Sequence, residues 1–281
     1  MQECDRIAEV RQAVREARSA GRSVGFVPTM GYLHRGHMAL VAKARAECGF
    51  VVASVFVNPL QFAPNEDFEQ YPRDPARDRA LLEQAGVDLL FAPSVMEMYP
   101  RPVATQVSVP ALSRTLEGKT RPTHFQGVAT VVLKLFQIVQ PDRAYFGQKD
   151  GQQVAVLRRM VSDLSVPIEL CVVPTVREPD GLALSSRNTY LGPEDRQAAL
   201  QLHQALRKGE GLVRSGGCSP DGVRDAMLAT LRESPRVRPD YAEVVDPETM
   251  APAAALSGRI MLAVAAYVGP TRLIDNVIIE G

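Results

Sequence analysis

The sequence contains few cysteines and has no net charge. Its four cysteines, Cys4, Cys48, Cys171 and Cys218, lie far apart and form no C-x-x-C pair. This spacing argues against a zinc ribbon or a thioredoxin-like redox site, so we expect free thiols in a reducing compartment. The 32 Lys and Arg residues equal the 32 Asp and Glu residues. The chain therefore lacks the basic excess that a nucleic-acid partner usually requires.

The sequence also lacks a long apolar run. No run approaches the roughly 18 residues that a membrane-spanning helix needs, and the first fifteen residues are charged throughout, unlike a signal peptide. With 46% hydrophobic and 23% charged residues, the composition is that of a globular protein rather than a disordered one. We therefore expect a cytoplasmic protein with neither a membrane nor a nucleic acid as its partner.

Short apolar runs alternate with amphipathic segments over the first 174 residues. The runs, which predict strands, are 24–27, 50–57, 87–91, 144–146 and 168–173. The amphipathic segments, which predict helices, are 5–18, 36–48, 75–85, 125–139 and 152–164. Because the runs are continuous rather than alternating, they favour a parallel sheet that is covered on both faces. The pattern predicts an α/β fold with a doubly wound, Rossmann-like domain over residues 1–174.

The pattern changes after Pro174. Helical periodicity covers 193–213 and 220–231, and three closely spaced apolar runs follow at 241–245, 260–267 and 273–279. Helices followed by neighbouring strands indicate a smaller α+β domain over residues 175–281.

Two of the four histidines follow the first predicted strand of the sheet. The sequence P-T-M-G-Y-L-H-R-G-H occupies residues 28–37 and leads into a helix. If His34 lies in the turn and His37 in the first helical turn, both can face one ligand. A helix N-terminus favours phosphate, and glycines such as Gly36 let a nucleotide approach the backbone. The alternatives are histidines that only decorate a helix start, or a zinc pair, for which nearby ligands are lacking.

Two further segments carry groups that suit a polyphosphate. In A-Y-F-G-Q-K-D, residues 144–150, Lys149 can meet a phosphate and Asp150 can hold Mg²⁺ through water. The alternative is an exposed Lys-Asp pair. In T-V-R-E-P-D-G-L-A-L-S-S-R-N, residues 175–188, Arg187 can neutralise charge and two serine hydroxyls add donors. We interpret this segment as a loop that closes over a substrate.

Polar side chains also follow the second predicted strand. Asn58 and Gln61 in F-V-N-P-L-Q-F are neutral amides suited to a hydroxyl or carboxylate, although an ordinary polar loop is an alternative. Arg121 and His124 precede a helix in R-P-T-H-F; solvated charge is the simplest interpretation, and their roles stay open. His203 lies in an amphipathic pattern and is interpreted as a surface or packing residue.

Together, these motifs resemble those of the pantothenate synthetase family, within the HIGH-motif nucleotidyl transferase superfamily. The matches include P-T-M-G-x-L-H-x-G-H, F-V-N-P-x-Q-F and R-P-x-H-F, and they run in order from about residue 26 to residue 276. Two positions depart from the family pattern, because Gln148 replaces a glutamate and Leu184 replaces a methionine.

The resemblance implies an enzyme, a pantoate–β-alanine ligase that forms AMP and serves coenzyme A precursor biosynthesis. Pantoate and ATP would give pantoyl adenylate and pyrophosphate, and β-alanine would convert the adenylate to pantothenate and AMP. It implies His34, His37, Lys149 and Arg187 as catalytic residues. It also implies Mg²⁺ as the cofactor and a homodimer.

The resemblance assigns binding residues as well. The residues implied to contact ATP are Met30, Gly31, Tyr32, Leu33, His34, Arg35, Gly36, His37, Gly147, Gln148, Lys149, Asp150, Val176, Leu184, Ser185, Ser186 and Arg187. Gln61 and Gln153 would bind pantoate, Gln61 would also bind β-alanine, and Asp150 would hold the metal.

The residues themselves favour displacement by positioning and charge neutralisation, because the sequence has no G-x-S-x-G or Cys-His nucleophile pattern. Two rival functions stay open. One is a nucleotidyltransferase that releases its adenylylated product, which AMP as the final product would exclude. The other is a non-catalytic nucleotide-binding protein, which would bind ATP without turnover.

Overall fold

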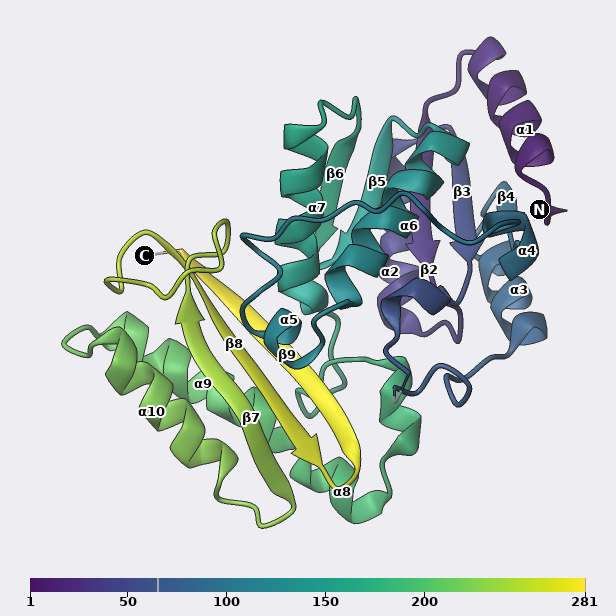
Figure 1. The fold of residues 1–281 in the computed structure, drawn as a ribbon. Coiled ribbons are helices and arrows are strands. Elements are labelled where there is room, and N and C mark those ends of the chain that lie inside the picture. The colour runs from purple at the N-terminus through teal and green to yellow at the C-terminus, as the bar shows by residue number, and fades with distance from the viewer. Residues whose placement is uncertain (65, 281) are drawn as a thin grey trace. The chain divides into compact units, whose positions relative to one another are not determined.

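The computed structural model describes residues 1–64 and 66–280. They form two compact units (Figure 1). The first unit contains Met1–Gly147 and Val156–Pro174, and the second contains Gln148–Ala155 and Thr175–Gly281. This grouping does not test whether 1–174 and 175–281 are separate folding domains, so those boundaries stay a prediction.

The first unit is built on a six-stranded sheet whose order is β1-β4-β3-β2-β5-β6, and every pairing in it is parallel. Its strands are β1 (Gln2–Cys4), β2 (Val24–Thr29), β3 (Phe50–Val55), β4 (Leu89–Phe91), β5 (Arg143–Gly147) and β6 (Glu169–Val173). The central strands are buried almost throughout, as their continuous apolar runs predict. The doubly wound parallel sheet is confirmed.

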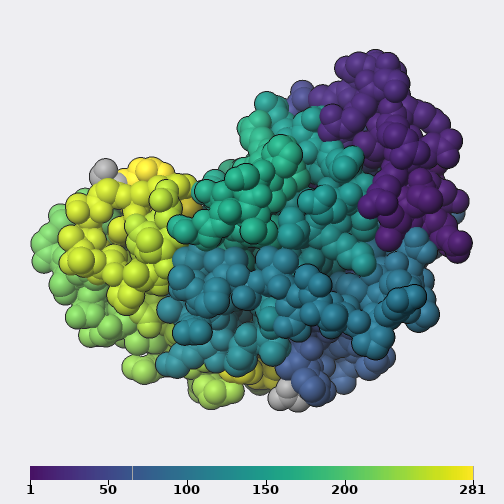
Figure 2. Space-filling model, turned by 45° about the horizontal axis from the view of Figure 1, so that its top comes forward, coloured from purple at the N-terminus to yellow at the C-terminus, as the bar shows by residue number. Residues whose placement is uncertain are grey.

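Helices connect these strands. They are α1 (Ile7–Ser19), α2 (Arg35–Glu47), α3 (Pro75–Gln84), α4 (Val95–Met98), α5 (Glu117–Thr120), α6 (His124–Val139) and α7 (Gly151–Asp163), with 3-10 turns η1 (Pro59–Gln61) and η2 (Gln148–Asp150). Helix α1 packs against α6, and α2 packs against α3, β5 and β6. In Figure 2, α1 forms the purple surface at the upper right. None of the helices in residues 1–64 and 66–280 has the length and hydropathy to span a bilayer.

The second unit contains a three-stranded antiparallel sheet of order β7-β8-β9. Its strands are β7 (Val237–Val245), β8 (Arg259–Val268) and β9 (Thr271–Glu280), and its helices are α8 (Pro193–Ala198), α9 (Leu200–Ser215), α10 (Pro220–Leu231) and the 3-10 turn η3 (Ser186–Tyr190). Helices α9 and α10 pack on this sheet, α9 against β8 and β9 and α10 against β7 (Figure 1). The predicted small α+β architecture is confirmed.

Several boundaries differ from the predictions. The helix predicted over 193–213 is two helices, because at Ala199 the amide of Leu202 bonds a carbonyl three residues back rather than four. Strand β7 begins at Val237 rather than near residue 241, and Pro239 lies at a register shift, which an edge strand tolerates. Strand β2 continues through Pro28 to Thr29. Elements too short for periodicity, β1, α4 and α5, were not predicted.

Candidate active site

The sheet reverses its strand order between β2 and β5. From β2 the chain moves to β3 and β4 on one side, and it returns to β5 and β6 on the other. In open α/β sheets, ligands bind outside the carboxyl ends of the strands at this switch point. Residues 28–37, which we call the histidine turn, leave β2 at that point and lead into α2.

The two histidines of this turn form a reciprocal cap at the start of α2. His34 is the N-cap residue, and its Nδ1 accepts from the amide of Gly36 at 3.1 Å. The amide of His34 in turn donates to His37 Nδ1 at 3.3 Å, and the two ring centroids are 4.0 Å apart. Because each Nδ1 accepts a hydrogen bond, the neutral rings carry their protons on Nε2. The pair therefore combines two Nε2 donors with a helix N-terminus, an arrangement that suits an anion.

A buried carboxylate holds the backbone of the histidine turn. Asp78 of α3 is 2% exposed, and its two oxygens accept from the amides of Tyr32 and Leu33, both at 2.7 Å. Burial raises the pKa of Asp78, and the two amide donors oppose that rise. Gly31 at φ +83° and Tyr32 at φ +51° make the sharp bend that brings these amides to one carboxylate. A Cβ at Gly31 would lie 3.0 Å from Asp78 Oδ2.

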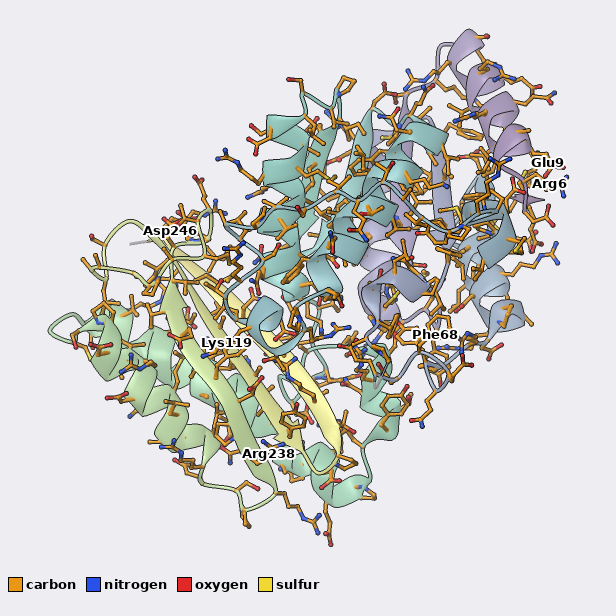
Figure 3. All side chains as sticks on the ribbon, in the orientation of Figure 1. Arg6, Glu9, Phe68, Lys119, Arg238 and Asp246 are labelled. Atoms are coloured by element: carbon orange, nitrogen blue, oxygen red, sulfur yellow. The ribbon has the colours of Figure 1, made fainter. Side chains whose placement is uncertain are left out.

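A pocket of about 290 Å³ lies beside this turn, within the first unit. Met30, Gly31, Phe56 and Asp78 contribute to its wall, together with Phe68, which is labelled in Figure 3 and belongs to the segment that joins η1 to α3. Met30 and Gly31 belong to the residues that the sequence predicts to contact ATP. The pocket is therefore continuous with the histidine turn.

The two amides that follow β3 have different roles. Asn58 is 1% exposed, and its Nδ2 donates to Gln61 Oε1 and to the carbonyl of Gly127, both at 3.2 Å. It is therefore directed into the protein, unlike the ligand-facing amide that the sequence suggests. Gln61 Nε2 lies 2.9 Å from the sulfur of Met30, so Gln61 reaches the histidine turn. Because a thioether is a weak acceptor, a carboxylate or hydroxyl can replace it.

Arg121 and His124 are structural partners rather than solvated charges. Arg121 pairs with Glu66 at 2.6 Å, and its charge and hydrogen bonds outweigh burial to hold the pKa of Glu66 below its usual range. His124 Nδ1 lies 3.0 Å from the carbonyl of Gln61. Burial, aided by the Arg121 charge, lowers the pKa of His124 to about 4, so the ring is neutral near pH 7. Both residues hold the backbone of Gln61.

In the second unit, Lys149 and Asp150 lie on η2. Lys149 Nζ is 3.6 Å from Asp150 Oδ1, and about half of the Asp150 side chain is exposed. Asn276 of β9 fixes this turn, because its Nδ2 donates to the carbonyls of Gln148 and Lys149 at 3.0 and 2.8 Å. Gln148 Nε2 donates back to Asn276 Oδ1 at 3.0 Å. Gln148, which replaces the family's glutamate, is therefore joined to Asn276 by two hydrogen bonds, one through its side chain and one through its carbonyl.

Residues 175–188, which we call the serine–arginine hairpin, fold back on themselves. The amide of Leu184 donates to the carbonyl of Val176 at 3.0 Å, and Arg177 forms an antiparallel bridge with Ala183. Ser185 caps η3 by accepting from the amide of Arg187 at 3.3 Å. The two arms of this hairpin, around Val176 and Leu184, are therefore adjacent.

One ion pair secures this hairpin to β9. Arg177 contacts the Asp275 carboxylate at 2.6 and 3.0 Å, and Asp275 is 3% exposed. The same guanidinium donates to the carbonyl of Gly181 at 3.1 Å. The His203 ring packs against Gly181 at the tip of the hairpin, so closely that a Cβ added at Gly181 would overlap the ring. The interpretation of His203 as a packing residue agrees with this contact.

The predicted site residues thus form two groups. Within the first unit, residues 30–37 and Gln61 lie together, although the Leu33 side chain is fully buried in the core. Within the second unit, the Lys149 turn and the serine–arginine hairpin are both bonded to β9. Gly147 ends β5, Gln153 is half-buried on α7, and Arg35 is exposed on α2.

Sequence reasoning missed the residues that hold these groups in place. Asp78, Arg177, Asp275 and Asn276 are distant in sequence from the segments they fix, apart from Arg177 within its own hairpin. For Asp275 and Asn276 the signal was a polar pair within an otherwise apolar strand pattern, T-R-L-I-D-N at 271–276, whereas nothing in the local pattern set Asp78 or Arg177 apart from nearby charged residues. That signal suggests a buried polar contact but does not name its partner.

The chain matches known proteins over nearly its whole length. The family model described as pantoate-beta-alanine ligase matches residues 2–278. A pantothenate synthetase of Moorella thermoacetica is 56% identical over 274 residues, which cover 98% of this chain and 97% of the relative. The crystal structure of pantothenate synthetase from Thermus thermophilus is 55% identical with a TM-score of 0.93, and 99% of each chain is covered.

A third relative has a ligand-bound structure. Pantoate-beta-alanine ligase from Francisella tularensis, complexed with beta-gamma ATP and beta-alanine, is 36% identical with a TM-score of 0.81. The match covers 99% of this chain and 97% of that one. Because the family model and these relatives match nearly the whole chain, this protein belongs to the pantoate–β-alanine ligase family.

Proposed function

We propose that this protein joins pantoate to β-alanine with the consumption of ATP. The products are pantothenate, AMP and pyrophosphate, and the pathway it serves is the synthesis of the coenzyme A precursor. Family membership over residues 2–278 supports the reaction class. The single observation that supports the site assignment most strongly is the reciprocal histidine cap at the start of α2. This cap puts two hydrogen-bond donors, the Nε2 groups of His34 and His37, at the switch point of the sheet.

The reaction has two displacements. In the first, a carboxylate oxygen of pantoate bonds to the α-phosphorus of ATP, the bond from that phosphorus to the bridging oxygen breaks, and pyrophosphate leaves. In the second, the amine nitrogen of β-alanine bonds to the acyl carbon, the acyl C–O bond breaks, and AMP leaves. The amine loses a proton as the amide forms. Neither step requires a nucleophile from the protein.

We assign the histidines to the first displacement. The Nε2 donors of His34 and His37 would bind the α- and β-phosphate oxygens, whose negative charge grows as the bridging bond breaks. Because their Nδ1 atoms are bonded within the cap, the rings are oriented before ATP arrives. Because His37 Nδ1 accepts from the His34 amide, the neutral ring would donate a hydrogen bond through Nε2 and keep its proton.

Lys149 and Arg187 are assigned to phosphate binding. A lysine supplies a point charge and an arginine a planar fork of donors, and both neutralise phosphate oxygens. The remaining ATP contacts proposed are those on the histidine turn, at 147–150 and on the serine–arginine hairpin. Gln61 and Gln153 are assigned to pantoate, and Gln61 also to β-alanine.

We further propose that ATP is used with Mg²⁺ and that Asp150 helps to hold it. A hard carboxylate oxygen on a half-exposed side chain fits a cation whose other ligands are phosphates and water. Among the described residues, no group of three His, Cys, Asp or Glu side chains is arranged to hold a metal by itself. When bound, Mg²⁺ would neutralise charge on the phosphate oxygens.

The decisive experiment is an assay of AMP release from ATP and Mg²⁺ in the presence of pantoate, with and without β-alanine. AMP that appears only with all three substrates supports the ligase. Pyrophosphate release without any AMP, even when β-alanine is present, indicates a nucleotidyltransferase that releases its adenylylated product or an adenylation half-reaction that stalls. ATP binding without either product indicates a non-catalytic nucleotide-binding protein and contradicts the proposal.

Three further proposals rest on the family resemblance and composition: a homodimer, a cytoplasmic location, and folding domains at 1–174 and 175–281. Light scattering during size-exclusion chromatography tests the first, fractionation the second, and expression of the two segments alone the third.

A further inference from the structure

Tyr99 lies at the start of a hydrogen-bond chain that leads to Gln61. It follows α4, and its hydroxyl donates to Asn58 Oδ1 at 2.9 Å. Asn58 Nδ2 donates to Gln61 Oε1 at 3.2 Å. Gln61 Nε2 then reaches the sulfur of Met30 at 2.9 Å. All four side chains belong to the first unit.

The partners fix the direction of each amide in this chain. The carbonyl of Gly127 can only accept, so the side of Asn58 that faces it must be the nitrogen. The Asn58 oxygen consequently faces two donors, the Tyr99 hydroxyl and the amide of Leu60 at 3.3 Å. The Tyr99 contact is the shorter of the two and therefore contributes more to this orientation.

The orientation of Asn58 sets that of Gln61. Because Asn58 offers an N–H to Gln61, the Gln61 oxygen turns toward Asn58 and its nitrogen turns toward Met30 in the histidine turn. Gln61 is 7% exposed and Asn58 1%, so neither amide can rotate without leaving buried groups unpaired. Gln61 therefore presents donors, which suit a carboxylate or hydroxyl and not an amine.

The Tyr99 side chain is itself held. Its ring lies 6.0 Å from the ring of Phe56, and Lys134 Nζ lies 5.2 Å from its centroid while donating to the carbonyl of Met98. Burial raises the pKa of the Tyr99 phenol above its usual value, so the hydroxyl keeps its proton near neutral pH.

We propose that Tyr99 is a positioning residue that, through Asn58, holds Gln61 as a hydrogen-bond donor and so selects a substrate acid. This inference rests on the proposed function, in which Gln61 binds pantoate. It assigns to the α4 terminus a part in acid recognition that acts through Asn58 and Gln61.

The test is Tyr99→Phe, which removes only the hydroxyl. Steady-state AMP release at saturating β-alanine gives KM for pantoate and KM for ATP. We expect KM for pantoate to rise about five- to tenfold, whereas KM for ATP changes less than about twofold because the histidine turn keeps its own anchor. Tyr145→Phe is the matched control. It removes another buried hydroxyl, which donates to Glu47 at 2.8 Å, and should leave both KM values unchanged.

A second variant decides the case if Tyr99→Phe does not fold. Asn58→Asp has nearly the same shape, but its carboxylate can no longer donate to Gln61. Gln61 would then turn its nitrogen toward residue 58 and its oxygen toward the substrate. KM for pantoate should then rise more than in Tyr99→Phe. Unchanged KM for pantoate in either folded variant, or equal rises for pantoate and ATP, would overturn the proposal. Absence of activity in the wild type would instead overturn the proposed function.

Discussion

The histidine turn and the serine–arginine hairpin are each held by one buried aspartate, but the donors that meet it differ. Asp78 accepts from two backbone amides of the turn. Asp275 accepts from the guanidinium of Arg177, with only its neighbour's amide, that of Asn276, as a backbone donor among the described hydrogen bonds. A backbone anchor fixes the path of the chain whatever side chains the turn carries. An anchor made by one arginine depends on that residue, because its loss leaves a buried carboxylate without its cation.

The largest effect should come from a histidine proposed to bind the reacting phosphates rather than from either aspartate anchor. His37→Ala removes a proposed donor to the transition state, and we expect the rate of pyrophosphate release to fall about 100-fold or more. The fold should survive, because the His34 amide loses its partner at the partly exposed start of α2, where water can replace it. Single-turnover kinetics measures the rate, and circular dichroism checks the fold. A nearly normal rate would remove His37 from the mechanism.

Breaking the hairpin anchor should have the largest effect on stability. Arg177→Met leaves Asp275 buried without its cation, at a cost of about 3 kcal/mol in the free energy of unfolding. Urea unfolding measures this cost. The double variant Arg177→Met, Asp275→Leu should recover most of it, because both charges are then removed. If the single variant is as stable as the wild type, the ion pair is not an anchor.

Acid should weaken the first unit through His124. Its pKa is about 4 in the folded protein against an ordinary value of 6.5, so the unfolded chain binds the extra proton between these values. The contribution of neutral His124 is complete above pH 6.5 and is lost as the pH falls toward 4, by about 2–3 kcal/mol. His124→Asn, whose Nδ2 can still donate to Gln61, should show a flatter stability curve over this window. Parallel curves for the two proteins would contradict this assignment.

Asp78→Asn tests the backbone anchor. The amide keeps the shape but directs an N–H toward a backbone donor, which should lower stability by about 1–2 kcal/mol. Because the histidines move with the turn, kcat should fall by about tenfold while KM for pantoate changes little. Thermal unfolding and steady-state kinetics together measure both effects. A stability loss without a kinetic loss would show that the turn does not depend on this aspartate for its position.

The smallest effect is expected for Gln148→Glu, which installs the family's usual residue. An ionised glutamate cannot donate to Asn276 Oδ1, so one hydrogen bond of about 1 kcal/mol is lost. The two bonds from Asn276 to backbone carbonyls remain. We expect a fall in the melting temperature of a few degrees and activity within about threefold. A larger loss would mean that Gln148 has a role beyond this contact.

Local patterns in the chain were enough to predict the elements and the chemistry of the two halves. Continuous apolar runs require strands buried on both faces, and their alternation with helical patterns limits the sheet to a parallel arrangement. The H-x-G-H pattern after a strand suggested His34 in the turn and His37 in the first helical turn, and in the structure His34 caps α2 and His37 lies in its first turn. These features depend on neighbouring residues, so periodicity and capping rules reach them.

Long-range packing, in contrast, determines which polar groups face a ligand and which are structural. Asn58 and Gln61 are similar amides three residues apart, but only their distant partners, Tyr99 and Gly127, turn one inward and orient the other. Likewise, β1 exists only because it pairs with β4, more than 80 residues away. Hydrogen bonds between segments remote in sequence leave no periodic trace, because each depends on one pair of groups brought together by packing.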